Sequence, residues 1–190
     1  MASQTARIQK RKKRWISVNA SKEFNSVPLG ETMAFDPASI VGRTMQINLM
    51  TLMNDPKKQS IAISFKISSV QENQAVAETI RYEVLPTHIK RMTRKDREKI
   101  EDSFICETKD NMRVRVKPVL FTRRSVKHSV ATAIRNQTKA MLQEVIKNEE
   151  YAALFHLLVS NQLQKEIRDR MNKIYPLAGC EIRVLEKVAA

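Results

Sequence analysis

The residue types that usually carry chemistry are few in this 190-residue chain, and their spacing excludes the common catalytic and metal sites. The three histidines, His88, His128 and His156, stand far apart, with no second histidine or carboxylate at ligand spacing. His156 lies in an apolar run and is expected to be partly buried. Cys106 and Cys180 form no CxxC pair, which indicates neither a zinc ribbon nor a disulfide framework and favours a reduced, intracellular protein. The sequence therefore predicts no enzyme, no metal and no cofactor.

Three further patterns exclude other classes of protein. Three isolated glycines cannot form the Gly-rich loops that bind phosphates in P-loop or dinucleotide folds. Neighbouring carboxylates such as Glu149 and Glu150 lie on charged segments for which no cleft is predicted. No apolar run approaches the roughly 20 residues of a membrane span, so no membrane partner is expected. Binding through surplus positive charge is the chemistry that remains.

That charge is concentrated in two places. Lysine and arginine total 34 against 20 acidic residues, a formal net charge of +14, and the surplus lies in two acid-free segments. Clustered cations favour a polyanion, because each one placed on a phosphate releases condensed counterions. The candidate RNA contacts in residues 1–14 are Arg7, Lys10, Arg11, Lys12, Lys13 and Arg14. Those in residues 111–143 are Arg113, Arg115, Lys117, Arg123, Arg124, Lys127, His128, Arg135 and Lys139.

Trp15 directly follows the first basic segment, and two interpretations of it are open. Its ring can stack on a base, which makes it a candidate RNA-binding residue. It can instead be a buried anchor that ties the basic segment to the core, which is the commoner use of a lone tryptophan at the start of a strand. Residues 1–14 are also similar in composition to an organelle transit peptide. The lysine run that leads straight into Trp15 disfavours this interpretation.

Hydrophobic periodicity predicts the elements that position these residues. Alternation indicates strands over residues 41–49, 61–67, 75–82, 104–108 and 113–122, whereas residues 25–38 are predicted to be a loop. Residues 109–112 favour a hairpin, and Pro118 requires a strand edge or a bulge. From residue 126 to residue 145 the period becomes 3.6, which predicts a helix with one apolar side. On this helix Arg124, His128, Arg135 and Lys139 are expected to form a basic stripe nearly opposite the apolar side.

These elements predict an α+β protein with a curved or barrel-like, mostly antiparallel β core flanked by C-terminal helices. Residues 1–14 are expected to be a disordered, flexible basic arm. Residues 15–122 would form the β-rich core, with one charged helix near 88–102, and residues 123–174 a helical region. Residues 175–190 would supply a closing strand that packs with the core as one domain.

Several short motifs, in order along residues 13–187, resemble those of one ribosomal family. Residues 13–20 (KRWISVNA), 40–43 (IVGR), the hairpin 108–117 with the following 121–124 (FTRR), and 174–177 (IYPL) are similar to the small-subunit ribosomal protein family of archaea and eukaryotes called S-three-A-e, or e-type S-one. Ser21 stands where the family usually has proline, and Asn111 where it usually has glycine. Asparagine tolerates the left-handed conformation that a tight hairpin needs, so the turn is expected to survive. The end of the chain at Ala190, without the long eukaryotic extension, favours an archaeal source.

The resemblance implies a structural constituent of the small ribosomal subunit that acts in translation in the cytoplasm, on the platform near the messenger exit. Its partners would be small-subunit ribosomal RNA and neighbouring platform proteins. Messenger RNA and initiation factors are further candidate partners, and no DNA is expected. Two other functions stay open from the residues themselves. One is a protein-interaction adaptor or translation-factor docking module that uses residues 149–159, and the other is a free regulatory binder of RNA or DNA.

Overall fold

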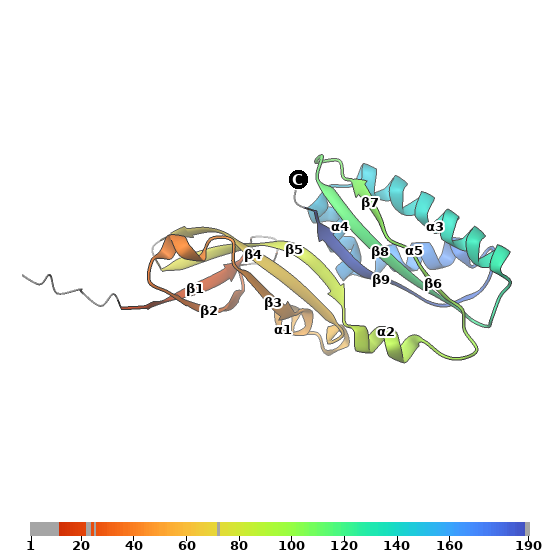
Figure 1. Ribbon diagram of the computed structural model, residues 1–190, viewed down its shortest axis with the longest axis horizontal. Helices are drawn as coiled ribbons and strands as arrows, with labels where there is room; N and C mark the ends of the chain where they lie inside the picture. The colour runs from red at the N-terminus through yellow and green to blue at the C-terminus, as the bar shows by residue number, and fades with distance from the viewer. Residues whose placement is uncertain (1–11, 22–23, 25, 72, 189–190) are drawn as a thin grey trace, which may run out of the picture. The chain divides into compact units, whose positions relative to one another are not determined.

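The structure is a computed structural model, and it describes residues 12–21, 24, 26–71 and 73–188 (Figure 1). The described residues confirm the predicted α+β class, because they form a mixed nine-stranded sheet that does not close, with most helical residues after its eighth strand. The strands are β1 (Arg14–Ala20), β2 (Pro28–Ala34), β3 (Thr44–Asn48), β4 (Ile61–Gln71), β5 (Gln74–Val84), β6 (Lys99–Glu101), β7 (Phe104–Glu107), β8 (Arg113–Thr122) and β9 (Leu177–Lys187). The helices are α1 (Leu49–Met53), α2 (Pro86–Met92), α3 (His128–Asn148), α4 (Tyr151–Val159) and α5 (Gln162–Met171).

The chain divides into two compact units. The first unit comprises Met1–Met45 and Phe65–Glu78, and the second comprises Gln46–Ser64 and Thr79–Ala190. Strands β4 and β5 contribute residues to both units. Each unit is described below by itself.

In the first unit, β1 pairs antiparallel with β2 and parallel with β5. Ile16 and Val18 are fully buried and alternate with exposed residues, as the sequence of β1 predicts for a strand with one covered face. The predicted arm lies mostly outside the described residues, since these begin at residue 12. Its last residue, Arg14, is already the first residue of β1.

Strand β2 lies within residues 25–38, which are predicted to be a loop, so that prediction is wrong for Pro28–Ala34. Its Pro28 and Gly30 are typical of turns, but both fit a strand with a free edge. Pro28 is the first residue of β2, where a missing N–H costs least. Gly30 has a φ of +143° and stands opposite Val18, next to a register shift, a conformation that glycine adopts without strain.

In the second unit, β9 lies between β5 and β8 and pairs antiparallel with both, which confirms the predicted closing strand. Strands β6 and β7 pair antiparallel with β8. The hairpin predicted at residues 109–112 joins β7 to β8, with Asn111 at a left-handed φ of +57°. The irregularity predicted at Pro118 is a register shift in the β8–β9 pair between Lys117 and Pro118.

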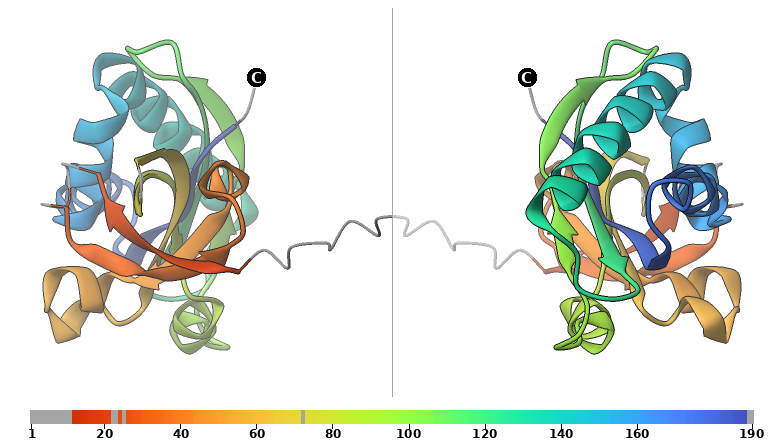
Figure 2. Two further views of the ribbon diagram at one scale, coloured as in Figure 1. Left: turned by 90° about the vertical axis from the view of Figure 1, so that its left-hand side faces the viewer. Right: turned by 90° about the vertical axis from the view of Figure 1, so that its right-hand side faces the viewer.

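Helices α3, α4 and α5 lie against one face of the β6–β9 strands in the second unit (Figure 2). The helix predicted over residues 126–145 is confirmed as α3. Its buried side, however, is not the side that the sequence pattern predicted. Ala131, Ile134 and Leu142 are buried, whereas the apolar Ala133 is exposed. The ring of Tyr82 on β5 meets the ring of Phe155 on α4 edge-on, with 6.0 Å between centroids.

The charged helix predicted near 88–102 is shorter in the structure. It corresponds to α2, which ends at Met92. Residues 99–101 form β6 instead, because they pair with residues 119–121 of β8. The high charge of the segment does not oppose this pairing, since only Ile100 of β6 is buried.

Candidate nucleic-acid interface

The connection between β8 and α3 carries three of the predicted RNA contacts on a firmly held backbone. The buried hydroxyl of Thr122 donates to the carbonyl of Arg124 at 2.6 Å and accepts from the N–H of Glu98 at 2.9 Å. The N–H of Arg123 donates to the carbonyl of Pro176 at 3.1 Å. The buried end of β8 therefore fixes the direction in which residues 123–127 leave the sheet.

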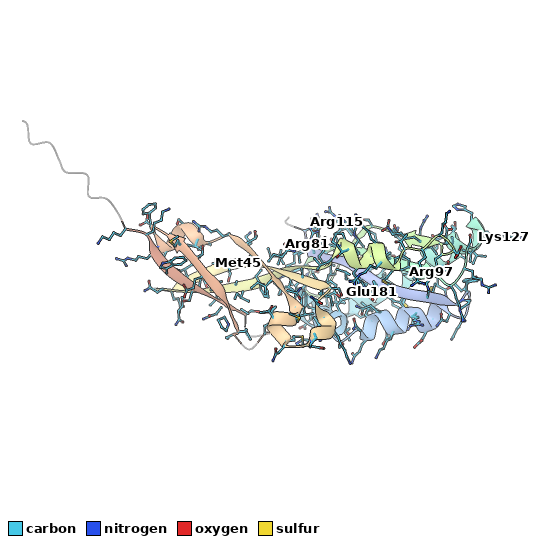
Figure 3. The ribbon with its side chains drawn as sticks, turned by 90° about the horizontal axis from the view of Figure 1, so that it is seen from below. Met45, Arg81, Arg97, Arg115, Lys127 and Glu181 are labelled. Atoms are coloured by element: carbon cyan, nitrogen blue, oxygen red, sulfur yellow. The ribbon has the colours of Figure 1, made fainter. Side chains whose placement is uncertain are left out.

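Arg123, Arg124 and Lys127, here called the loop cations, are all exposed. Among the residues that the structure describes, none of the three takes part in an ion pair. Lys127 immediately precedes α3, whose first amides point toward the same loop and add positive potential. Figure 3 shows Lys127 at one end of the second unit. The loop cations are thus free to bind phosphate.

The predicted basic stripe on α3 lies beside the buried side of the helix and not opposite it, so the predicted orientation is wrong. Arg135 follows the buried Ala131 by one turn. It is half-buried, and its Nε is enclosed and has no hydrogen-bond partner in the described part of the chain. Lys139 is exposed, with its Nζ 5.8 Å from the ring centroid of Phe104. His128 is exposed at the first position of α3. The sequence pattern misplaced the stripe because the true apolar side also includes Thr138, a polar residue that is buried.

The cations of β8 differ from the loop cations because two of them are already neutralised. Arg113 Nε lies 3.3 Å from Glu107 Oε1, and Arg115 Nη1 lies 2.9 Å from Glu186 Oε1. Lys117 is half-buried and has no ion pair among the described residues. All three side chains lie on the less buried face of β8, which makes Arg113 and Arg115 weaker candidates for phosphate than the loop cations.

The first basic segment is described only from residue 12 onward, so Arg7, Lys10 and Arg11 lie outside the described residues. Lys12, Lys13 and Arg14 are exposed. Trp15 is 60% exposed, which excludes the buried anchor favoured for it. The anchor inside β1 is Ile16, because strand alternation turns the residue after Trp15 to the covered face.

A basic cleft that sequence analysis missed lies in the second unit, between the turn at residues 56–60 and α2. Its cavity volume is about 820 Å³, and its ionisable lining residues are Lys57, His88 and Arg91, with no carboxylate among the lining residues. Burial and the charge of Arg91 lower the pKa of His88, so its imidazole is neutral at neutral pH. Lys57 and Arg91 belong to small clusters of charge outside the two acid-free segments, and only the fold brings them together.

Comparison with known proteins identifies the chain. The sequence model described as the Ribosomal S3Ae family matches residues 3–189. The chain belongs to this family. Membership confirms the resemblance seen in the motifs, and it makes the chain a ribosomal protein, a structural constituent of the ribosome in translation and not an enzyme.

Several curated relatives are archaeal, and the chain matches most of their length. The chain is 31% identical to the small ribosomal subunit protein eS1 of Natronomonas pharaonis over 183 residues, which cover 96% of this chain and 89% of that protein. It is 32% identical to the protein of the same name from Nanoarchaeum equitans, with 87% and 84% covered. The eS1 protein of Archaeoglobus fulgidus is 32% identical, with 93% and 85% covered.

The alternative docking segment of this ribosomal protein, residues 149–159, uses its apolar side chains internally. Tyr151, Leu154, Phe155 and Leu158 of α4 are buried in the second unit, and the backbone N–H of Tyr151 donates to Asp110 at 3.1 Å. His156 is exposed, so the expectation of a partly buried histidine is wrong. Helix α4 therefore offers a partner little apolar surface.

The remaining reactive groups are enclosed or scattered. Cys106 and Cys180 are buried, and burial raises the pKa of both thiols, that of Cys180 to about 12. Cys180 lies inside β9. Within the described ranges, no three His, Cys, Asp or Glu residues group as metal ligands. No helix in those ranges is long and apolar enough to cross a membrane.

Proposed function

We propose that this ribosomal protein binds small-subunit ribosomal RNA through the loop cations Arg123, Arg124 and Lys127. The observation that carries the proposal is that these side chains are exposed and form no ion pair with any residue that the structure describes, at the start of a 21-residue helix. Positive side chains without carboxylate partners are free to replace the counterions of a phosphate backbone. The names of the relatives place those proteins in the small subunit, and the same assembly is proposed for this chain.

The finer location is part of the proposal. We place the protein on the platform of the small subunit near the messenger exit, in the cytoplasm, beside neighbouring platform proteins. This location rests on the family resemblance of the motifs. Secondary RNA contacts would come from residues beside the loop cations and from the arm: His128, Arg135, Lys139, Arg7, Lys10, Arg11, Lys12, Lys13 and Arg14.

The salt dependence of RNA affinity tests the proposal. An archaeal small-subunit ribosomal RNA transcript is titrated with the protein and with the triple variant Arg123→Gln, Arg124→Gln and Lys127→Gln at several salt concentrations. Each lost phosphate contact is expected to reduce the slope of log affinity against log salt by about 0.7–0.9, so the triple variant should lose about 2–3 units of slope.

A matched control separates local contact from total charge. Lys165, Arg168 and Arg170 of α5 are also exposed cations of the second unit, and changing them to glutamine removes the same charge. The control triple variant should keep the slope of the unchanged protein. Equal losses for the two triple variants would show that only net charge matters, and the proposal would then fail.

A second measurement separates a resident ribosomal component from a transient factor. After fractionation of a lysate, the protein should remain with small subunits through a high-salt wash, because many phosphate contacts dissociate slowly together. Release into the supernatant would favour the adaptor or the free regulatory binder instead.

A further inference from the structure

The basic cleft of the second unit has the size and the charge of a site for a small anionic ligand. It lies between the turn at residues 56–60 and α2, and its cavity volume is about 820 Å³. Clefts of about 300–1,000 Å³ are typical of sites that bind small ligands. No aspartate or glutamate of the described chain lines this cleft, so its fixed charges are all positive. They favour an anion as the ligand.

The fixed charges come from both walls of the cleft. Lys57 belongs to the turn and Arg91 to α2, both are exposed, and neither forms an ion pair with another described residue. Asp55 is the acid closest to Lys57 along the chain, but it does not line the cleft, and its Oδ1 accepts from the N–H of Lys57 at 3.0 Å. Like charges that share a cavity repel each other, so an anion bound between them is attracted by both.

The walls of the cleft are held in place before any ligand binds. The N–H of Leu85 donates to the carbonyl of Ser60 at 2.8 Å, which ties the start of α2 to the end of the turn. Ile89 of α2 is buried, and Met92 lies so close to Gly179 of β9 that a Cβ added there would be 2.5 Å from Met92 Cε. A site that is formed in advance loses little binding free energy to ordering.

The charge of the cleft matches a phosphate monoester better than a carboxylate or a phosphodiester. A monoester carries a charge of about −1.5 to −2 at neutral pH, and it has three terminal acceptor oxygens. Lys57 and Arg91 are both cationic, and His88 adds no charge, because burial and the charge of Arg91 lower the pKa of its imidazole. A carboxylate of a protein partner and an internal phosphate of an RNA chain each carry a single charge. Either would leave one cation of the cleft unbalanced.

The uncharged lining residues fit the rest of a nucleotide. Ser60 and Thr87 contribute hydroxyl groups, which can bond to phosphate oxygens or to ribose hydroxyls. Pro56, Leu85 and Met92 contribute apolar surface against which a sugar or base ring can pack. Inorganic phosphate would leave that apolar surface unused. The lining therefore favours a phosphate that is attached to a nucleoside.

We propose that the basic cleft binds the phosphate monoester of a nucleotide, with Lys57 and Arg91 as its ion-pair partners. Two sources carry this group: the phosphorylated end of an RNA strand and a free nucleoside monophosphate. The site goes beyond the proposed function and does not depend on it, because none of the loop cations lines the cleft. An acidic protein segment is the competing occupant, and the test includes it.

Calorimetric titration of the full-length protein compares uridine 5′-monophosphate with uridine, inorganic phosphate and a short polyglutamate peptide. Uridine should bind about 100-fold more weakly than the monophosphate, because it forms neither ion pair. Inorganic phosphate should bind about tenfold more weakly, because it does not use the apolar lining. An affinity for uridine equal to that for the monophosphate would overturn the site, and so would an equal affinity for the peptide.

Neighbouring lysines provide a matched control for the two cations of the cleft. Lys58 and Lys90 lie next to Lys57 and Arg91 in the same two elements, but neither lines the cleft. The double variant Lys57→Gln and Arg91→Gln should bind uridine 5′-monophosphate roughly 100-fold more weakly, since each lost contact costs about a factor of ten. Lys58→Gln with Lys90→Gln removes the same charge and should leave the affinity unchanged. Equal losses would show an effect of net charge alone and would overturn the site.

Oligonucleotides distinguish the two sources of the phosphate. A short oligouridylate with a 5′-phosphate and the same strand with a 5′-hydroxyl each compete with uridine 5′-monophosphate for the full-length protein. Displacement by the phosphorylated strand alone supports an RNA end as the ligand, whereas displacement by neither strand supports a free nucleotide. Equal displacement by both strands would show that internal phosphodiesters fill the cleft, and the monoester site would then fail.

These outcomes are independent of the test of the loop cations. If the loop-cation variant loses its salt slope while the double variant of Lys57 and Arg91 binds uridine 5′-monophosphate normally, the proposed function stands and the cleft site fails. If the double variant loses the nucleotide but the loop-cation variant keeps its salt slope, the cleft site stands and the proposed function fails.

Discussion

Arg115 and Glu186 form an ion pair across the β8–β9 pair, with Arg115 Nη1 2.9 Å from Glu186 Oε1. The other oxygen of the same carboxylate lies 2.8 Å from Arg81 Nη1, and Arg81 also binds Glu83 at 2.9 Å. Figure 3 shows Arg81 and Arg115 next to each other in the second unit. The network links three neighbouring strands, so Arg115 serves the fold although sequence analysis placed it among the RNA contacts.

This relationship predicts that Glu186→Gln lowers the free energy of unfolding by about 1–2 kcal/mol, because two arginines then face each other without a shared carboxylate. Arg115→Gln should cost less, about 1 kcal/mol, and should leave the salt slope of RNA binding unchanged. Urea unfolding and the RNA titration measure the two effects. Glu166→Gln, at an exposed position of α5, is the control and should change neither. A reduced salt slope for Arg115→Gln would return that residue to the interface.

The buried carboxyl of Glu181 predicts that the free energy of unfolding falls as the pH rises. Burial raises the pKa of its carboxyl from the ordinary 4.5 to about 7, so the folded state holds the proton more tightly than the unfolded state. The stabilisation is complete below about pH 4.5 and is lost as the pH rises through about 7, a total of about 3 kcal/mol. The same carboxylate also raises the pKa values of Tyr82 and Cys180, after burial as the main cause.

Glu181→Gln should remove this pH dependence and stabilise the protein at about pH 8, because it keeps the shape without a charge to bury. Urea unfolding at about pH 5 and about pH 8 measures the difference. Glu166→Gln should retain the fall with pH. If Glu181→Gln and the unchanged protein lose the same free energy between the two conditions, the buried carboxyl is not its source.

Asn111 predicts a stabilising substitution at the hairpin. Its φ of +57° is left-handed, and its N–H donates to the carbonyl of Thr108 at 2.9 Å, so the turn cannot relax without breaking that bond. Asn111→Gly should raise the free energy of unfolding by roughly 0.5 kcal/mol, whereas Asn111→Ala should lower it by about 1 kcal/mol. Thermal unfolding followed by circular dichroism orders the three proteins. Any order other than Gly, Asn, Ala would contradict the steric argument.

The sequence predicted the long periodic strands and the long helix well, and it failed for the short edge strand β2. The apolar period of the sequence predicts several long elements: alternation predicts strands β4, β5 and β8, and a period of 3.6 predicts helix α3. Strand β2 was missed because Pro28 and Gly30 are typical of turns, and only pairing with β1 makes that segment a strand. The α+β class was predictable because hydrophobic periodicity is a property of each segment of the sequence. Strand β2 was not predictable because it depends on pairing with another strand, which the local sequence does not show.

The sequence shows which segments of the candidate interface are basic, but it does not show which of their cations form ion pairs. Net charge drew attention to the loop cations, which are exposed and have no ion pair among the described residues, because an acid-free segment offers no carboxylate of its own to neutralise them. It also selected Arg113 and Arg115, since a sequence does not show that Glu107 and Glu186 lie across the sheet from them. Pairing between distant segments decides which cations remain free.

The basic cleft gives the last prediction, because its charges come from the turn that carries Lys57 and from helix α2. His88 lies beside Arg91, and the positive charge of Arg91 helps to lower the pKa of the imidazole. A bound phosphate would reverse this effect, since an anion favours the protonated imidazole. The pKa of His88, measured by NMR titration, should therefore rise when an archaeal small-subunit ribosomal RNA fragment is added.

Two variants test the charges of the cleft separately from the loop cations. Arg91→Gln should raise the pKa of His88 in the free protein, because the like charge is removed, and should reduce the rise caused by RNA. Lys57→Gln together with Arg91→Gln should lower the salt slope of RNA binding by about 1–2 units if both cations contact phosphate. His156, exposed on α4 and in none of the proposed contacts, serves as the internal reference in the same NMR spectra. If RNA leaves the pKa of His88 unchanged and the double variant keeps its slope, the cleft is a surface without a phosphate, and the loop cations bind RNA without it.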